Sequence, residues 1–353
     1  MNLYSQKQYL EDVNLVAGSN LPWMKLKDRS ILLSGATGLI GSFLVDVLMQ
    51  KNLEGLNCKI YALSRNRQKA EMRFSEYNNN HLLEIVSLDV NTLLPPQSFG
   101  TIDYVLHLAS NTHPRQYATD PIGTILTNVV GLKNILDLCT QKNVSRFLFA
   151  SSVEIYGENR GDVELFDETY CGYIDSNTVR AGYPESKRCG EALCQAYMSQ
   201  YNIDIVISRL ARSYGPTMSL TDSRAISQFI IKGINGEDIV LKSDGKQLFS
   251  YTYVADAVSG VFTVLLKGEK GEAYNIAEEN SNITLKDLAE SIATYSGKRA
   301  IYEKPDSIEA TGFSKTTKAL MDGSKLNALG WKPFYTIQEG IIRTIDILKD
   351  GDK

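Results

Sequence analysis

Residues 30–48 read SILLSGATGLIGSFLVDVL, and this stretch decides the fold. An apolar run at Ile31–Leu33 leads into Gly35, Gly38 and Gly41, and apolar residues at helical spacing follow. The pattern predicts a strand, a tight glycine turn and a helix, although G-x-x-G-x-x-G also fits a turn without a ligand. Glycines let the backbone approach a ligand closely, and the free N–H groups of a helix start attract a pyrophosphate. The residues expected to touch it are Gly35, Thr37, Gly38, Leu39, Ile40 and Gly41.

The bulk composition excludes several classes of protein. A chain of 353 residues predicts one large domain or two closely joined ones. The formal net charge of -4 gives no electrostatic reason to expect nucleic acid or an anionic membrane as a partner. No apolar run is expected to approach the roughly 20 residues that cross a bilayer. Five cysteines without C-x-x-C spacing, and no apolar signal segment, predict reduced thiols, a cytoplasmic location and no metal site.

Apolar strand-like runs alternate with helical patterns after the glycine turn. This alternation predicts an α/β fold with a doubly wound parallel sheet, covered on both faces. Ligands bind such sheets outside the carboxyl ends of the strands. The further expected strands are Cys58–Leu63, Leu82–Leu88, Asp103–Leu108, Phe147–Ala150 and Ile203–Ser208.

The pattern changes after Arg209, where glycines punctuate shorter elements. We therefore expect a nucleotide-binding domain over 28–210, with a return to it around 252–277. A smaller C-terminal α/β substrate lobe is expected over 211–251 and 278–347. Residues 1–27 form an N-terminal extension, read as a structural cap, with a regulatory arm as the weaker alternative.

The end of the second strand bears on the choice of cofactor. An acidic residue there holds the ribose hydroxyls of NAD, whereas an arginine can neutralise the 2′-phosphate of NADP. This chain has no Asp or Glu until Glu71, while Arg65 and Arg67 stand near the expected phosphate. The pair slightly favours NADP over NAD, unless both arginines are only solvated loop charges. Other expected cofactor contacts are Asp89, Val90, Leu108, Ala109, Ser110 and Arg209.

The segment Tyr183–Lys187 is a candidate for acid/base chemistry, although Y-x-x-x-K spacing on its own also arises by chance. Residues four apart on a helix share a face, so the lysine ammonium can lie near the phenol. A tyrosine has a pKa of about 10, and a nearby lysine and an oxidised nicotinamide would lower it. The result is an acid/base group for a sugar hydroxyl or ketone, and Ser152 could hydrogen-bond the same oxygen. Tyr183 and Lys187 are also expected to contact the cofactor.

Five motifs together resemble the extended short-chain dehydrogenase/reductase family, and most closely its nucleotide-sugar epimerases, dehydratases and decarboxylases. The motifs are GATGLIG at 35–41, HLAS at 107–110, SSVEIYG at 151–157, Tyr183–Lys187 and SYGP at 213–216. The resemblance implies a Rossmann domain with NAD(P), a lobe for the nucleotide sugar, and a Ser152–Tyr183–Lys187 triad. It further implies a homodimer and a role in the synthesis of cell-surface polysaccharide precursors.

Within that family the chain looks most like UDP-glucuronate decarboxylases. Glu154 matches their active-site glutamate, as a second acid/base group or as a carboxylate that only orients its surroundings. Three positions depart from the pattern: Arg212 replaces an asparagine, while Thr217 and Phe249 replace arginines. Because an arginine fork is geometrically demanding, these changes alter how a pyrophosphate or carboxylate is held. The expected substrate contacts are Asn111, His113, Arg180, Arg212, Phe249 and Tyr251.

Three functions compete at this point. The leading hypothesis is transient oxidation of a nucleotide-sugar hydroxyl, followed by epimerisation, dehydration or decarboxylation. The second is NADPH-dependent reduction of a nucleotide-linked ketose to an alcohol. It is favoured by Arg65, Arg67 and the altered Arg212 and Phe249 pair. The third is a non-enzymatic NAD(P)-sensing scaffold, and an intact triad argues against it because a sensor does not need all three side chains.

Overall fold

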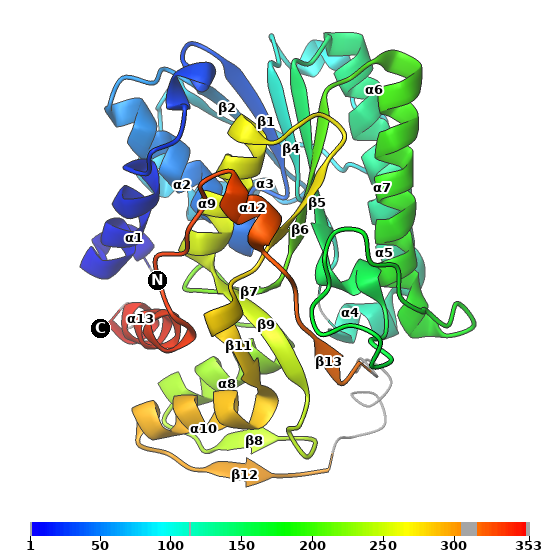
Figure 1. The fold of residues 1–353 in the computed structure, drawn as a ribbon. Helices are drawn as coiled ribbons and strands as arrows, with labels where there is room; N and C mark the ends of the chain where they lie inside the picture. Colours follow the sequence, from blue (N-terminus) through cyan, green and yellow to red (C-terminus); the bar gives the residue numbers. More distant parts are fainter. Residues whose placement is uncertain (1, 113, 305–315, 351–353) are drawn as a thin grey trace.

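Seven parallel strands form the central sheet in the order β10-β6-β5-β4-β1-β2-β3 (Figure 1). The computed structural model describes residues 2–112, 114–304 and 316–350. The predicted Rossmann-type α/β fold is confirmed, because each expected strand lies within this sheet. The strands are β1 (Ser30–Ser34), β2 (Lys59–Ser64), β3 (Leu83–Ser87), β4 (Tyr104–His107), β5 (Arg146–Ser152), β6 (Ile205–Leu210) and β10 (Ala273–Ile276).

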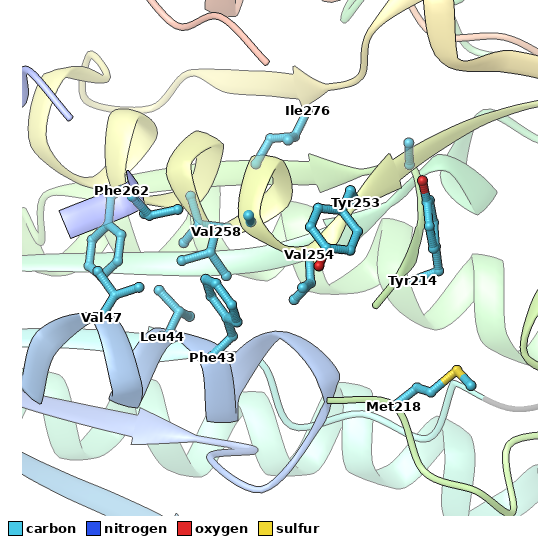
Figure 2. Close-up of a cluster of buried hydrophobic side chains, with 14 of the residues drawn as sticks. Phe43, Leu44, Val47, Tyr214, Met218, Tyr253, Val254, Val258, Phe262 and Ile276 are labelled. Carbon is cyan, nitrogen blue, oxygen red and sulfur yellow. The ribbon is translucent and has the colours of Figure 1, made fainter. Parts of the chain in front are cut away.

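Helices cover both faces of the sheet. Successive β1 side chains point to opposite faces, so Ile31 and Leu33 join the core beneath α2 and α9, whereas Leu32 joins the core beneath α6 and α7. All three are completely buried, which explains their unbroken apolar run. Figure 2 shows α2 and α9 packing through Phe43 and Phe262. These helices are α2 (Leu39–Leu53), α9 (Val254–Lys267), α6 (Leu132–Lys142) and α7 (Gly182–Tyr201).

The helical run from Pro121 to Lys142 is not one regular α-helix. It consists of α5 (Pro121–Leu126), a π-helical turn (η5, Thr127–Gly131) and α6. Among the described residues, Pro121–Lys142 is the one helical run long and apolar enough to cross a membrane, by length and composition only. This corrects the expectation that no run approaches that length. In the folded protein, 56% of the most apolar 18-residue stretch of this run is buried, as in the core helix of a globular protein.

The smaller lobe lies at the carboxyl edge of the sheet. β6 continues through Ala211 into β7, which pairs with β9 of the lobe, so the strand ends face it (Figure 1). One sheet contains β7 (Arg212–Tyr214), β9 (Leu248–Tyr253), β11 (Asn282–Thr284) and β13 (Lys318–Ala319), and a second contains β8 (Ile239–Leu241) and β12 (Ala300–Tyr302). The lobe's helices are α8 (Ala225–Ile234), α10 (Leu285–Ser296) and α13 (Ile337–Asp350).

The N-terminal extension is fastened to both parts of the protein. Its helix α1 (Lys7–Ala17) packs against α2, α9 and α13. Asp46 of α2 is completely buried and accepts hydrogen bonds from Tyr4, Tyr9, Tyr77 and Arg73. Asp12 of α1 accepts hydrogen bonds from Tyr253, Tyr335 and Arg343. These buried contacts support the reading of the extension as a structural cap.

The remaining helical segments among the described residues are short. They are α3 (Arg67–Arg73), α4 (Pro114–Thr119), α12 (Ser324–Ala328) and the 3-10 turns η1 (Leu3–Ser5), η2 (Trp23–Leu26), η3 (Ser75–Tyr77), η4 (Pro96–Ser98), η6 (Val153–Tyr156), η7 (Val179–Ala181) and η8 (Glu279–Ser281).

Candidate active site

The glycine turn between β1 and α2 forms one side of the site. Gly35 has φ of +73°, and a Cβ there would come within 2.8 Å of the Ala109 nitrogen. A Cβ at Gly41 would lie 2.2 Å from the Gly35 oxygen. Packing therefore requires these two glycines. Gly38 differs, because it is exposed and a Cβ would approach only the Gly35 oxygen, at 3.2 Å.

The N-terminus of α2 is open to a ligand. The helix begins after Gly38 without a side-chain cap on its first N–H groups. Thr37, Leu39 and Ile40 are half-buried around this turn. The Thr217 hydroxyl donates to the Leu39 carbonyl at 2.7 Å, so a loop at the start of the smaller lobe touches the turn directly.

The expected triad meets at the carboxyl edge of β5. Ser152 is the last residue of β5, and Tyr183 and Lys187 lie one turn apart near the start of α7. The Lys187 ammonium is buried and donates to the Ala150 carbonyl at 2.8 Å. Burial lowers the pKa of Lys187 to about 8, which leaves it mainly protonated at neutral pH.

Tyr183 is buried, and its ring stacks on Tyr117 with centroids 4.8 Å apart. Burial raises the pKa of Tyr183, whereas the side-chain hydrogen bond with Ser152 and the charges of Arg180 and Arg224 lower it. Burial has the larger effect, so the phenol alone is a weak base. It needs additional positive charge, such as an oxidised nicotinamide, to act near neutral pH.

Glu154 lies between two arginines beside the triad. Arg180 Nη2 donates to its carboxylate at 2.8 Å, and Arg212 Nη2 lies 3.7 Å from its other oxygen. Burial would raise the pKa of Glu154, but the two guanidinium groups lower it below its ordinary value. Glu154 is therefore a carboxylate at neutral pH. Arg212 also stacks on the Phe249 ring, 3.8 Å from its centroid.

Two of the expected substrate-binding residues, Arg212 and Phe249, contact each other from neighbouring strands. Arg212 of β7 and Phe249 of β9 belong to paired strands, with Arg212 opposite Tyr251, two residues from Phe249. Tyr251 is buried. Asn111 is buried at the edge of the site, and His113 lies outside the residues that the structure describes.

Arg209 is not placed as expected. Its guanidinium forms two hydrogen bonds with Glu191 at 2.7 and 3.0 Å, and it also donates to the Tyr156 hydroxyl and the Glu168 carbonyl. Through these four bonds the Arg209 guanidinium connects β6 to α7 and to the segment after β5. Arg209 is therefore a structural residue, which corrects its assignment as a cofactor contact.

The other expected cofactor contacts lie along the strand ends. Leu108, Ala109 and Ser110 follow β4, and the Ala109 nitrogen lies against Gly35. The Asp89 carboxylate accepts the Asn91 N–H at 2.9 Å, and the Val90 carbonyl accepts a hydrogen bond from Asn134. Both residues belong to the loop after β3.

The two arginines after β2 behave differently. Arg67 donates to Glu71 one helical turn away at 2.7 Å. Arg65 is exposed directly after the last residue of β2. Of the pair, Arg65 is therefore the one without an ion-pair partner among the described residues.

Sequence reasoning missed Asn128, Tyr117 and Arg224. Asn128 is fully buried in the π-helical turn, accepts from the Ser110 hydroxyl at 2.7 Å and donates to the Ser186 hydroxyl at 2.8 Å. A buried amide within an apolar helical run was a usable signal. Tyr117 and Arg224 meet Tyr183 only through tertiary structure, so no local pattern marked them.

Comparisons with known proteins agree with this geometry. Residues 31–277 match the model of the NAD dependent epimerase/dehydratase family. The chain is 30% identical to UDP-glucuronic acid decarboxylase 1 of Xenopus tropicalis over 90% of this chain and 72% of that protein. It is 32% identical to UDP-glucuronic acid decarboxylase 6 of Arabidopsis thaliana over 88% of this chain and 86% of that protein.

A solved structure shares the fold at lower identity. UDP-glucuronic acid 4-epimerase from Bacillus cereus, in complex with UDP-glucuronic acid and NAD, superposes with a TM-score of 0.78 and 22% identity. The match covers 91% of this chain and 99% of that one. With the glycine turn and the triad in place, the chain belongs to the NAD-dependent epimerase/dehydratase family.

Proposed function

We propose that this protein modifies a nucleotide sugar by oxidising one sugar hydroxyl and later reversing that oxidation, with NAD(P) as the bound hydride carrier. The observation that carries the proposal is the meeting of Ser152, Tyr183 and Lys187 beside the glycine turn. The open space over Gly38 and the uncapped start of α2 fit the pyrophosphate of a dinucleotide. The cofactor supplies hydride acceptance and return when bound.

The residues of the chain supply the proton chemistry. Tyr183 takes the proton of the sugar hydroxyl and returns it later, while Ser152 orients the same oxygen. Lys187 is held by the Ala150 carbonyl and contributes a positive charge one helical turn from the phenol. Glu154 acts as an anion because both of its arginines favour the carboxylate.

The test is a mass-spectrometric screen of nucleotide sugars with NAD and NADP supplied separately. A product formed without net NADPH consumption supports reversible internal oxidation. Stoichiometric NADPH oxidation by a nucleotide-linked ketose would instead establish the second function, the reductase. Exposed Arg65 is the observation that favours this alternative. A cofactor-binding scaffold without activity would convert none of the sugars.

Arg65 is proposed to select NADP over NAD. Replacing Arg65 by aspartate is expected to weaken NADP binding by about 10- to 100-fold, because a hydrogen bond to a charged group contributes about 1.5–3 kcal/mol. NAD binding should be retained or improved. Fluorescence titration with both cofactors measures the change, and Arg67→Ala serves as control because Arg67 is paired with Glu71. Equal loss for both cofactors would contradict this role.

A homodimer through α5 and α7 is also proposed. Apolar side chains are exposed on α5 and on the turns η5 and η7 next to α7, and a cavity of about 560 Å³ separate from the triad lies between α5 and the start of α7. Such a patch favours association. The exposed residues are Ile122, Ile125, Leu126, Val130 and Val179.

Replacing Ile122 by aspartate is expected to convert a dimer into a monomer, because a charge would be buried without a partner in the interface. Ile122 is 71% exposed in the single chain, so the fold should tolerate the change. Light scattering after size-exclusion chromatography measures the mass. Leu53→Asp, at a site 79% exposed on α2, is the matched control. A monomeric wild-type protein would refute the proposal.

A cytoplasmic location and a role in forming cell-surface polysaccharide precursors complete the proposal. The five free cysteines support the first, since thiols persist in reducing compartments. The family assignment supports the second.

A further inference from the structure

The Arg180–Glu154–Arg212 cluster carries one unbalanced positive charge. Its two guanidinium groups face a single carboxylate, and the neighbouring Arg224 is already paired with Asp222 at 2.5 Å. The side chains of the cluster are 17–28% exposed, so water screens them only partly. A ligand group with a single negative charge would neutralise this excess positive charge.

Donors without acceptors point to the same conclusion. Arg180 Nε and Nη1 and Arg212 Nε are buried and have no hydrogen-bond partner within the part of the chain that the structure describes. Unpaired buried donors are costly, and charged ones more so. The Phe249 and Tyr117 rings lie against the two guanidinium groups and hold their planes in place.

The cluster lies next to the reacting centre. Glu154 is two residues from Ser152, and Arg180 is three residues before Tyr183. Arg180 lies over the Tyr117 ring, which itself stacks on Tyr183. An anion held here is therefore close to the oxidised carbon of the sugar, rather than at the distant nucleotide end.

We propose that Arg180 and Arg212 bind a carboxylate carried by the sugar and thereby prevent its loss as carbon dioxide. The inference rests on the proposed function and names its substrate class, a nucleotide-linked uronic acid. A carboxylate two bonds from the new ketone is a β-keto acid, which loses carbon dioxide readily. Because leaving carbon dioxide is neutral, both ion pairs would be lost in the transition state, so binding the carboxylate opposes the cleavage.

The two possible outcomes differ in whether the bond to the carboxyl carbon of the oxidised sugar breaks. With the carboxylate held, the hydride leaves carbon, the hydroxyl proton goes to Tyr183, and both return on the opposite face to give the epimer. Without the clamp, the bond to the carboxyl carbon breaks and its electron pair forms an enolate. A proton from solvent adds to the enolate carbon, carbon dioxide leaves, and hydride return gives the pentose.

The test compares Arg212→Asn with wild type on UDP-glucuronic acid. Wild type is expected to give an isomeric uronic acid, and the variant to raise the ratio of released carbon dioxide to epimer at least 10-fold. Arg212→Lys should restore part of the wild-type ratio. Arg299→Asn is the matched control, since it removes an arginine ion-paired with Asp238 on the exterior of the same lobe. An unchanged ratio in Arg212→Asn overturns the inference.

Binding provides a second measurement. In a Tyr183→Phe background, calorimetry should find UDP-glucuronic acid bound at least 10-fold more tightly than UDP-glucose, and Arg212→Asn should remove that preference. Equal weakening of both ligands would assign Arg212 to the shared pyrophosphate and overturn the carboxylate assignment. Turnover of neutral nucleotide sugars alone overturns the inference but leaves the proposed function intact. Failure to convert any nucleotide sugar in the screen overturns both.

Discussion

Replacing Tyr183 by phenylalanine is expected to lower kcat by about 10²- to 10⁴-fold, the usual contribution of a positioned acid/base group. The phenylalanine ring keeps the stacking on Tyr117 but has no hydroxyl to accept the proton of the sugar. Substrate binding should therefore change little. Single-turnover kinetics with a substrate found in the nucleotide-sugar screen separate the chemical step from binding.

A matched variant on the same helix controls for the loss of a hydroxyl group. Tyr197 also lies on α7, but its hydroxyl donates to Asp137, away from the triad. Tyr197→Phe should keep kcat near wild type. Normal turnover by Tyr183→Phe would remove the proposed acid/base role and, with it, the mechanism.

Replacing Asp46 by alanine is expected to lower the free energy of unfolding by about 3–5 kcal/mol, as when one partner of a buried ion pair is removed. Asp46 is 1% exposed and accepts from Arg73 and three tyrosine hydroxyls. Removing the carboxylate deprives all four donors of this acceptor. Urea unfolding followed by circular dichroism measures the effect.

A surface aspartate provides the comparison for this stability loss. Asp244 is paired with Lys246, but their side chains are 61% and 85% exposed. Exposed pairs contribute about 0–1 kcal/mol, so Asp244→Ala should change little. If Asp46→Ala were equally mild, the N-terminal extension could not be fastened through that carboxylate.

The fold could be predicted from the sequence because the patterns that indicate it are local. The glycine turn, the apolar strands and the Tyr183–Lys187 spacing each lie within a few residues, so periodicity and turn chemistry predict them. The position of Ser152 could be predicted because parallel strands end at one edge of a sheet, whereas its grouping with Tyr183 and Lys187 was implied by the family resemblance. Element bounds differed by only one or two residues in most strands.

Contacts between distant segments could not be predicted in the same way. Glu154 and Arg180 come from two different 3-10 turns and Arg212 comes from a strand, so their pairing depends on tertiary packing. Arg209 shows the converse error. Its position after an apolar run suggested a ligand contact, but in the structure its guanidinium is ion-paired with Glu191 on α7. The π-helical turn was hidden for the same reason, since its apolar spacing resembles that of an ordinary helix.

The N-terminal helix has a consequence for how a substrate reaches the cleft. Through Asp12, α1 is hydrogen-bonded to Tyr253 of β9 and Arg343 of α13, while its other contacts hold α2 and α9. A hinge motion that separated the smaller lobe from the sheet would have to break this buried strap on one side. We therefore expect the smaller lobe and the sheet to move together, and substrate entry to involve loops at the rim rather than a hinge between the two.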